Sequence, residues 1–371
     1  MDRINKLDVF YKEQKVGTLA LYEKRYAAFE YDDEWMINGF SISPFSLPLE
    51  KKVFMPKIDP FDGIFGVFND SLPDGWGRLL VDRLMKRNGL EIAKVGNLER
   101  LAIVGDSGMG ALSYRPVINI KTQSNSLTLD EIADECERIL NSNESDNLDY
   151  LFENAGSSGG ARPKIFTKIN DEDWIIKFPS HLDDYGIGKQ EYDYALCAKE
   201  CGIIMSDVRL FESKKCSGYF GTKRFDVNSI TKERIHMVSA SGLLETSHRI
   251  PNLDYDLLMK LTLQLTKSMD ECLKLYRLMC FNVFAHNRDD HSKNFTYQYL
   301  DDEDRWILSP AYDLTYSNSI GGEHATTVHG NGVDPGVNDV LAVANEIGIS
   351  KIQAINIAKD IKECVHEHLG L

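Results

Sequence analysis

The chain has 371 residues, of which 43% are hydrophobic and 27% charged, and its formal net charge is −15. This acidic balance argues against a broad basic face that binds nucleic acid directly, and no apolar run is long enough to cross a membrane. The length predicts two or three domains, since one domain takes about 150 residues. With no apolar signal segment and no C-x-x-C pair among the seven cysteines, we expect a reduced, cytoplasmic protein.

The amino-terminal part is predicted to be rich in strands. Three stretches alternate in polarity as an antiparallel meander does, namely 7–11, 15–21 and 27–35. A helix is expected over 71–87, because Pro73 and Asp74 stand near its start and Gly89 just beyond its basic last turn.

A glycine-rich segment at 105–110 resembles a phosphate loop at first sight. Its spacing is G-x-x-G-x-G, and a strand is expected to follow it where the dinucleotide fingerprint requires a helix. We therefore predict a hairpin turn. A short acidic helix is predicted at 129–140, and the polar run 141–149 is the best candidate linker in the chain.

A second small-residue loop, 157–164, ends in basic residues and runs into a strand. Such a loop offers backbone N–H groups and positive charge to phosphates, although it lacks the Walker A spacing and a flexible turn is the alternative. The next apolar strand, 173–179, contains Lys177. A strand lysine aimed at ATP phosphates is a recurring part of kinases, and the alternative is an edge-strand lysine that reaches water.

The second half of the chain is predicted to be mainly helical. Helices are expected at 191–201, at 253–284 and near the carboxyl end, where Ser350 is the expected N-cap. Cys197 and Cys201 stand four apart on the first of these helices and are expected to be core residues. The histidines near the carboxyl end show no metal-ligand spacing.

The stretch 281–317 carries the strongest chemical signal. A polar loop, 287–294, is followed by a predicted strand, an acidic turn and a returning strand. In such a hairpin Asn294 and Asp313 lie at the same open end, and their hard oxygen atoms suit Mg²⁺. Asp289 lies on the adjacent loop and could accept a proton. This D-x-x-x-x-N spacing is that of kinase catalytic loops, and a capped, solvated turn is the alternative.

The order of these features is that of a protein kinase: small-residue loop, strand lysine, D-x-x-x-x-N loop, and Asp after a hairpin. Two other functions remain open. In a metal-dependent phosphohydrolase, the metal ligands would be His286, Asp289, Asp290 and His291. In a binding module, the chain would be a catalytically idle corepressor that works only through its partner.

The sequence resembles the HipA family, the serine/threonine kinase toxins of bacterial toxin–antitoxin pairs. The similarity covers nearly the whole chain and rests on segments in family order, namely 65–78, 157–164, 177–179, 224–226, 236–237, 287–294 and 310–313. The resemblance implies an α+β, two-lobed protein-kinase-like fold. Its β-rich amino-terminal part carries an extra subdomain (1–123) before the kinase N-lobe (124–226), and the C-lobe (227–371) is mostly helical.

The resemblance also assigns roles to single residues. Asp289 would be the base, Asn294 and Asp313 would hold Mg²⁺, and Lys177 would contact ATP phosphates. His291 is expected to be a structural loop residue. The expected nucleotide-binding residues are Ser158, Gly159, Gly160, Ala161, Arg162 and Lys164 in the loop, with Lys223 and Phe225 beside the adenine. Ser157 corresponds to the self-phosphorylated serine that switches family members off, and Arg162 departs from the usual Gln.

The expected partners follow from the same resemblance. Family members pair with small, HipB-like helix-turn-helix antitoxins and meet operator DNA only through them. They arrest growth by acting on translation, and a glutamyl-tRNA synthetase is the known type of target. We therefore expect an aminoacyl-tRNA synthetase or another translation component as the protein substrate, and no membrane partner.

Overall fold

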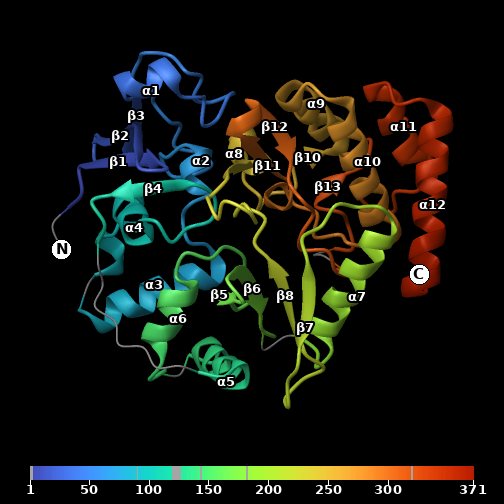
Figure 1. The fold of residues 1–371 in the computed structure, drawn as a ribbon, viewed down its shortest axis with the longest axis horizontal. Coiled ribbons are helices and arrows are strands. Elements are labelled where there is room, and N and C mark those ends of the chain that lie inside the picture. Colours follow the sequence, from blue (N-terminus) through green and yellow to red (C-terminus); the bar gives the residue numbers. More distant parts are fainter. Residues whose placement is uncertain (1–2, 90, 119–126, 143, 181–182, 319–320) are drawn as a thin grey trace. The chain divides into compact units, whose positions relative to one another are not determined.

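The computed structural model describes the chain except for residues 1–2, 90, 119–126, 143, 181–182 and 319–320. It divides into two compact units (Figure 1). Unit 1 comprises 1–188, 209–238 and 242–245, and unit 2 comprises 189–208, 239–241 and 246–371. The predicted boundary after residue 123 lies outside the described residues, and the division into three domains stays a prediction.

Unit 1 begins with a four-stranded sheet in the order β3-β2-β1-β4. Its strands are β1 (Lys6–Tyr11), β2 (Gln14–Tyr22), β3 (Tyr26–Tyr31) and β4 (Leu112–Arg115). The first two predicted strands are confirmed, but the third ends early. The side chain of Asp32 accepts a hydrogen bond from Glu34 N and thereby begins helix α1 (Asp33–Asn38) where a strand was predicted.

The glycine segment 105–110 is not the predicted hairpin turn. A helix, α4 (Asn97–Val104), precedes it, and β4 pairs with the distant β1. The segment is held instead by Asp226, whose carboxylate accepts a hydrogen bond from Gly110 N at 2.7 Å. Pairing across about a hundred residues decides this region, and local turn chemistry does not reveal it.

A second sheet in unit 1 has the order β5-β6-β8-β7. Its strands are β5 (Lys164–Ile169), β6 (Glu172–Lys177), β7 (Val208–Phe211) and β8 (Tyr219–Lys223). Three helices share its hydrophobic core: α3 (Gly75–Arg87), α5 (Leu129–Leu140) and α6 (Leu148–Ala155). The short α2 (Gly66–Asn69) and η1 (Ile92–Lys94) complete the unit.

Helix α3 begins at Gly75, where Asp74 is its N-cap, and its C-cap is Asn88, one residue before the predicted Gly89. Helix α6 was not predicted, because only seven residues separate the polar run 141–149 from the small-residue loop 157–164.

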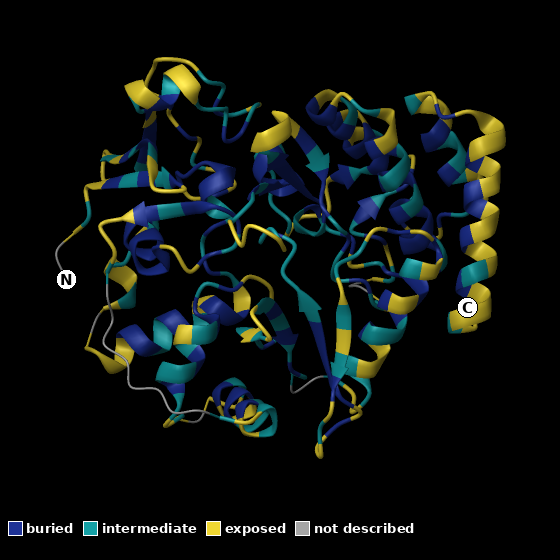
Figure 2. Cartoon of the chain, in the orientation of Figure 1, coloured by how far each residue is buried: buried dark blue, intermediate teal, exposed yellow. Residues whose placement is uncertain are grey.

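Unit 2 is mainly helical, as predicted, but the long predicted helix 253–284 is broken in two. Helix α9 (Tyr255–Thr266) ends at Lys267, whose φ of 54° is left-handed, and Ser268 caps α10 (Met269–Phe284). The carboxyl-terminal region forms α11 (Val337–Ile347) and α12 (Lys351–Leu369), and Ser350 is the N-cap of α12 as predicted. One face of α12 is buried and the other is exposed, because its buried residues recur every three or four positions (Figure 2).

The predicted hairpin of unit 2 is confirmed. Strand β11 (Thr296–Leu300) pairs antiparallel with β12 (Arg305–Leu308) across the turn η3 (Asp301–Glu303). A short parallel pair, β10 (Leu253–Asp254) and β13 (Thr326–Thr327), lies elsewhere in the unit.

Three remaining elements lie where the chain passes between the units: α7 (Ile187–Glu200), β9 (His236–Ser239) and α8 (Ala240–Leu244). Most of α7 belongs to unit 2. In the described part of the chain, no helix combines the length and the apolarity that a bilayer span requires.

Candidate active site

The small-residue loop of unit 1 is held by the start of helix α3. The backbone N–H of Trp76 donates to Gly160 O at 2.9 Å, and that of Asp74 donates to Ser158 O at 3.3 Å. Gly159 between these anchors is exposed, as are Gly160 and the following Ala161. The loop therefore has a fixed base and an accessible middle, as a nucleotide-covering loop requires.

Two glycines allow this close approach. A Cβ added to Gly75 would lie 2.2 Å from Gly160 O, and one added to Gly77 would lie 2.3 Å from Ser158 O. No other residue type fits there without displacing backbone. From the sequence, this segment predicted a helix start and a family resemblance, but its contact with the loop was missed. The available signal was a pair of glycines flanking Trp76 at the start of a helix, where propensity disfavours glycine.

The strand that leaves the loop places two lysines side by side. Lys164 on β5 is directly opposite Lys177 on β6, so their side chains emerge on the same face of the sheet. Lys177 shares this half-buried face with Ile175, as predicted, while Trp174 and Ile176 are buried on the other face. Like charges that face each other across strands are destabilising. An anion bound between these two ammonium groups would reverse the sign of that interaction.

The two adjacent serines of the loop differ in burial. The Ser158 side chain is 0% exposed, and its Oγ is buried without a hydrogen-bond partner in the described structure. The half-buried Ser157 hydroxyl donates to Ser107 O at 2.7 Å. Ser157 is therefore the more accessible of the two hydroxyl groups.

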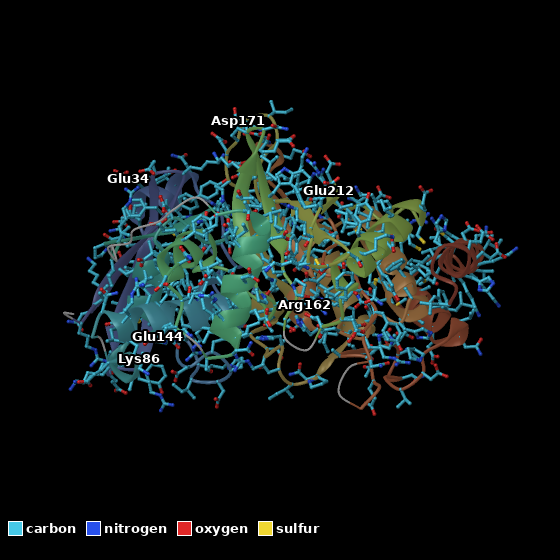
Figure 3. All side chains as sticks on the ribbon, turned by 90° about the horizontal axis from the view of Figure 1, so that it is seen from below. Glu34, Lys86, Glu144, Arg162, Asp171 and Glu212 are labelled. Atoms are coloured by element: carbon cyan, nitrogen blue, oxygen red, sulfur yellow. The ribbon has the colours of Figure 1, made fainter. Side chains whose placement is uncertain are left out.

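Arg162, labelled in Figure 3, forms a bidentate ion pair with Asp183, with Nε–Oδ2 and Nη2–Oδ1 distances of 3.1 and 2.9 Å. Burial alone would raise the pKa of Asp183, but hydrogen bonds from Ser180 and Arg162 lower it overall. The guanidinium group thus fixes the end of the loop to the segment after β6.

The predicted adenine-side residues follow strand β8. Lys223 Nζ lies 2.7 Å from Glu172 Oε1 and 6.0 Å from the centre of the Trp174 ring. Phe225 is half-buried at the start of the next turn. Asp226 then anchors the segment, because its buried carboxylate accepts hydrogen bonds from the Arg224 guanidinium at 2.9 and 2.7 Å.

In unit 2 the candidate base and metal ligands lie at the open end of the hairpin. Asn294 Nδ2 donates to Asp289 O at 2.7 Å, which leaves the amide oxygen of Asn294 as its ligand atom. The Tyr312 hydroxyl donates to Lys293 O at 2.5 Å and lies 2.6 Å from Thr296 Oγ1, so it fixes the segment that precedes Asp313.

Electrostatics place His291 among these groups. His291 Nε2 lies 4.0 Å from Asp289 Oδ1. Burial lowers the pKa of His291, and the nearby carboxylates of Asp289 and Asp313 act against that shift. Asp313 has a left-handed φ of 54°, which is uncommon outside glycine. Asn294 is thus bonded to Asp289, and the charges of Asp289 and Asp313 both act on His291, while the roles of the three residues stay a prediction.

A network of buried polar side chains holds the loop 287–294 in place through hydrogen bonds. Asn287 Nδ2 donates to Asn282 Oδ1 at 2.9 Å, Asn282 Nδ2 donates to the Tyr255 hydroxyl at 3.0 Å, and Tyr255 donates to Asp290 Oδ2 at 2.9 Å. His324 Nδ1 lies 3.0 Å from the same carboxylate oxygen. Burial, and then the charge of Asp290, raise the pKa of Tyr255. Sequence reasoning missed this network, although a polar Asn282 within an apolar helix was a signal.

The network speaks against the phosphohydrolase alternative. The second carboxylate oxygen of Asp290 accepts a hydrogen bond from Thr326 N at 3.1 Å, so both oxygen atoms serve structural contacts. In the described part of the chain, the donor atoms of His286, Asp289, Asp290 and His291 do not form a group close enough to hold a metal ion.

Comparisons with known proteins agree with these features. Two family models match the chain: the HipA N-terminal domain over 7–115 and the HipA-like C-terminal domain over 156–369. No protein with a curated description matches its sequence.

Two solved structures are similar to the chain. A chain of the Shewanella oneidensis MR-1 toxin–antitoxin complex of HipA, HipB and operator DNA is similar over 98% of this chain and 90% of its own, with a TM-score of 0.73 at 17% identity. The Helicobacter pylori proinflammatory kinase CtkA is similar over 57% of this chain and 88% of its own, with 16% identity and a TM-score of only 0.39, which supports no argument. The predicted α+β, HipA-like two-lobed fold is thus confirmed.

Proposed function

The chain belongs to the HipA family, and we propose that it is an ATP- and Mg²⁺-dependent serine/threonine protein kinase, the toxin of a toxin–antitoxin pair. The observation that carries the proposal is the hairpin, which has Asn294, bonded to Asp289 O, before its first strand and Asp313 after its second. These residues supply a base and two oxygen ligands, in the order that phosphoryl transfer uses.

Each proposed role in unit 2 follows from the position of a side chain. Asp289 is exposed on the loop and takes the proton of a substrate serine or threonine hydroxyl. That hydroxyl oxygen bonds to the γ-phosphorus of ATP, the bond to the bridging oxygen breaks, and ADP leaves. The hard oxygen donors of Asn294 and Asp313 fit Mg²⁺. Bound there, Mg²⁺ neutralises phosphate charge.

The proposed roles in unit 1 concern the nucleotide. Lys164 and Lys177 project from one face of the sheet next to the loop, and their ammonium groups suit the phosphates of ATP. The exposed Gly159, Gly160 and Ala161 present backbone N–H groups to the same phosphates, and Ser158 and Arg162 fix the loop at its ends. Lys223 and Phe225 lie beside the adenine.

We propose Ser157 as the site of autophosphorylation. Its hydroxyl is more accessible than that of Ser158, and its bond to Ser107 O must break when the hydroxyl is modified. A phosphate would add a charge of about −2 at this point and displace the loop from its anchor on α3.

The proposed partners extend the family relationship. The similar Shewanella oneidensis complex contains HipA, HipB and operator DNA. We infer a HipB-like helix-turn-helix antitoxin for this chain, which reaches operator DNA through that antitoxin. Its net charge of −15 suits a basic partner. The proposed substrate is a translation component such as an aminoacyl-tRNA synthetase.

Incubation with labelled ATP and Mg²⁺, followed by mass spectrometry of the chain, tests the proposal. We expect phosphate on Ser157, retained in Ser158→Ala and lost in Ser157→Ala and Asp289→Asn. Folded wild-type protein that binds ATP but transfers no phosphate to itself or to any protein would contradict the proposal. Growth arrest that is unchanged in Asp289→Asn would identify a binding module instead.

A further inference from the structure

Two helices of unit 2 each present a pair of metal-binding side chains. Cys197 lies on α7 and Cys201 just past its end, while Cys364 and His368 lie on α12. Each pair is separated by four residues, which places its two side chains on one face of a helix. Cys-x-x-x-Cys and Cys-x-x-x-His are thus brought together from segments more than 160 residues apart in the sequence.

The donor atoms of this cluster are close together. Those of Cys197, Cys364 and His368 all lie within 4.8 Å of one another. His368 Nδ1 lies 3.6 Å from Cys364 Sγ, and the Sγ atoms of Cys197 and Cys364 each lie 4.0 Å from the other residue's carbonyl oxygen. Ligands of a tetrahedral Zn²⁺ site at about 2.0–2.3 Å from the metal are separated by comparable distances.

Cys201 supplies a fourth donor. Its backbone N–H donates to Cys197 O at 2.9 Å, so Cys201 continues the last turn of α7 and its side chain lies on the same face as that of Cys197. Cysteine binds a metal ion as thiolate, so these side chains offer the soft sulfur donors that Zn²⁺ accepts.

The other cysteines of unit 2 provide the contrast. Cys272 is buried, and its thiol donates to Met259 O at 3.9 Å, as a core cysteine does. Cys364 is only partly buried and His368 is exposed, so the cluster is reachable from solvent. The sequence analysis expected Cys197 and Cys201 to be core residues. Both are buried, but their thiols face the ligating side chains of another helix.

We propose that this cluster is a structural Zn²⁺ site that joins α7 to α12. Its ligands are Cys197, Cys201, Cys364 and His368. Three thiolates and one imidazole favour Zn²⁺ over the hard cations Mg²⁺ and Ca²⁺. The thiols release their protons as the metal binds. The site is independent of the proposed Mg²⁺ ligands.

The site would stabilise the scaffold of the hairpin loop. The Tyr194 hydroxyl of α7 donates to Ala285 O, the C-cap of α10, at 3.0 Å, and the Tyr276 hydroxyl of α10 donates to Ala354 O of α12 at 3.3 Å. Both zinc-bearing helices thus contact α10, which leads directly into the loop 287–294 (Figure 1). A Zn²⁺ ion bound by both α7 and α12 would link these two helices directly, in addition to their contacts with α10.

Titration of the reduced, metal-free full chain with Co²⁺ and Zn²⁺ tests the inference. We expect one equivalent of Co²⁺ to give the thiolate charge-transfer absorption of a tetrahedral sulfur site, and Zn²⁺ to displace it. Cys364→Ser and His368→Ala should each weaken Zn²⁺ binding by on the order of 100-fold or more, since even the supporting partners of ligands contribute 10- to 100-fold. Zn²⁺ should raise the melting temperature of the wild type and not that of Cys364→Ser.

Cys272→Ala is the matched control, because it removes a buried cysteine of unit 2 outside the cluster and should leave binding unchanged. His368 is exposed, so its replacement tests binding without disturbing the core. The inference is overturned if Co²⁺ gives no charge-transfer band, or if His368→Ala and Cys364→Ser both bind Zn²⁺ as the wild type does. Formation of a disulfide bond between Cys197 and Cys364, together with no metal binding by the reduced chain, would also overturn the inference.

Discussion

The small-residue loop of unit 1 and the hairpin loop of unit 2 are held by different kinds of contact. Two glycines at the start of α3 allow its backbone to contact the backbone of the loop 157–164. The middle of that loop is exposed. Buried side chains joined by hydrogen bonds, from Asn287 to Asp290, hold 287–294. The first arrangement anchors the loop by its backbone and leaves its middle accessible. The second fixes side chains in position, as catalysis by positioning requires.

The largest expected effect is a loss of phosphoryl transfer. It distinguishes the proposed base in unit 2 from the proposed phosphate-binding lysine in unit 1. Asp289→Asn should reduce phosphoryl transfer on the order of 1,000-fold with ATP affinity unchanged, because a general base contributes about 10²–10⁴. Lys177→Met should reduce both transfer and ATP affinity. Single-turnover transfer and nucleotide titration measure the two quantities. Weakened ATP binding in Asp289→Asn would contradict the assignment of nucleotide binding to unit 1 and of proton transfer to Asp289.

The network of unit 2 is tested by Tyr255→Phe. Loss of this hydroxyl leaves Asn282 without its acceptor and Asp290 without one donor, and should cost about 1–3 kcal/mol of unfolding free energy. Phosphoryl transfer should fall as the loop loosens, while ATP affinity stays constant. Chemical denaturation and transfer assays provide the measurements. Tyr276→Phe, which removes a longer bond at 3.3 Å elsewhere in unit 2, should have less effect on transfer.

The backbone contacts of unit 1 are tested by Gly77→Ala. In a helix, alanine is more favourable than glycine by about 1 kcal/mol. The clash at 2.3 Å from Ser158 O should reverse this gain and destabilise the unit by about 1–3 kcal/mol. ATP affinity should also fall, as nucleotide titration would show.

Gly159→Ala is the control for this change, because a Cβ there meets no heavy atom within 4 Å. A variant Gly77→Ala with raised stability and normal ATP affinity would show that the contact with Ser158 does not hold the loop.

The smallest expected effect is a pH dependence of unit 1. Burial raises the pKa of Glu245 to about 7, although its carboxylate accepts a hydrogen bond from Gly66 N at 2.9 Å. The folded state therefore favours the protonated form. The stability this gives is complete below the unfolded-state pKa of 4.5 and is lost as the pH rises through about 7.

Glu245→Gln should remove that slope and stabilise the protein at pH 8 by about 1 kcal/mol, since one pKa unit corresponds to 1.36 kcal/mol and the group retains some solvent contact. Melting curves between pH 4 and 8 measure the difference. Parallel curves for wild type and variant would contradict the assignment.

The sequence by itself determined the hairpin, with Asn294 before its first strand and Asp313 after its second, and the position of Lys177 on its strand. Polarity alternation and turn residues act over a few neighbouring positions, so local patterns are enough to predict these features. Tertiary structure alone decided the rest. It broke the helix 253–284 at Lys267, replaced the predicted turn at 105–110 by pairing of β4 with β1, and brought the glycines of α3 under a loop some eighty residues away. Such contacts depend on how whole elements pack, and no local pattern of residues encodes that packing.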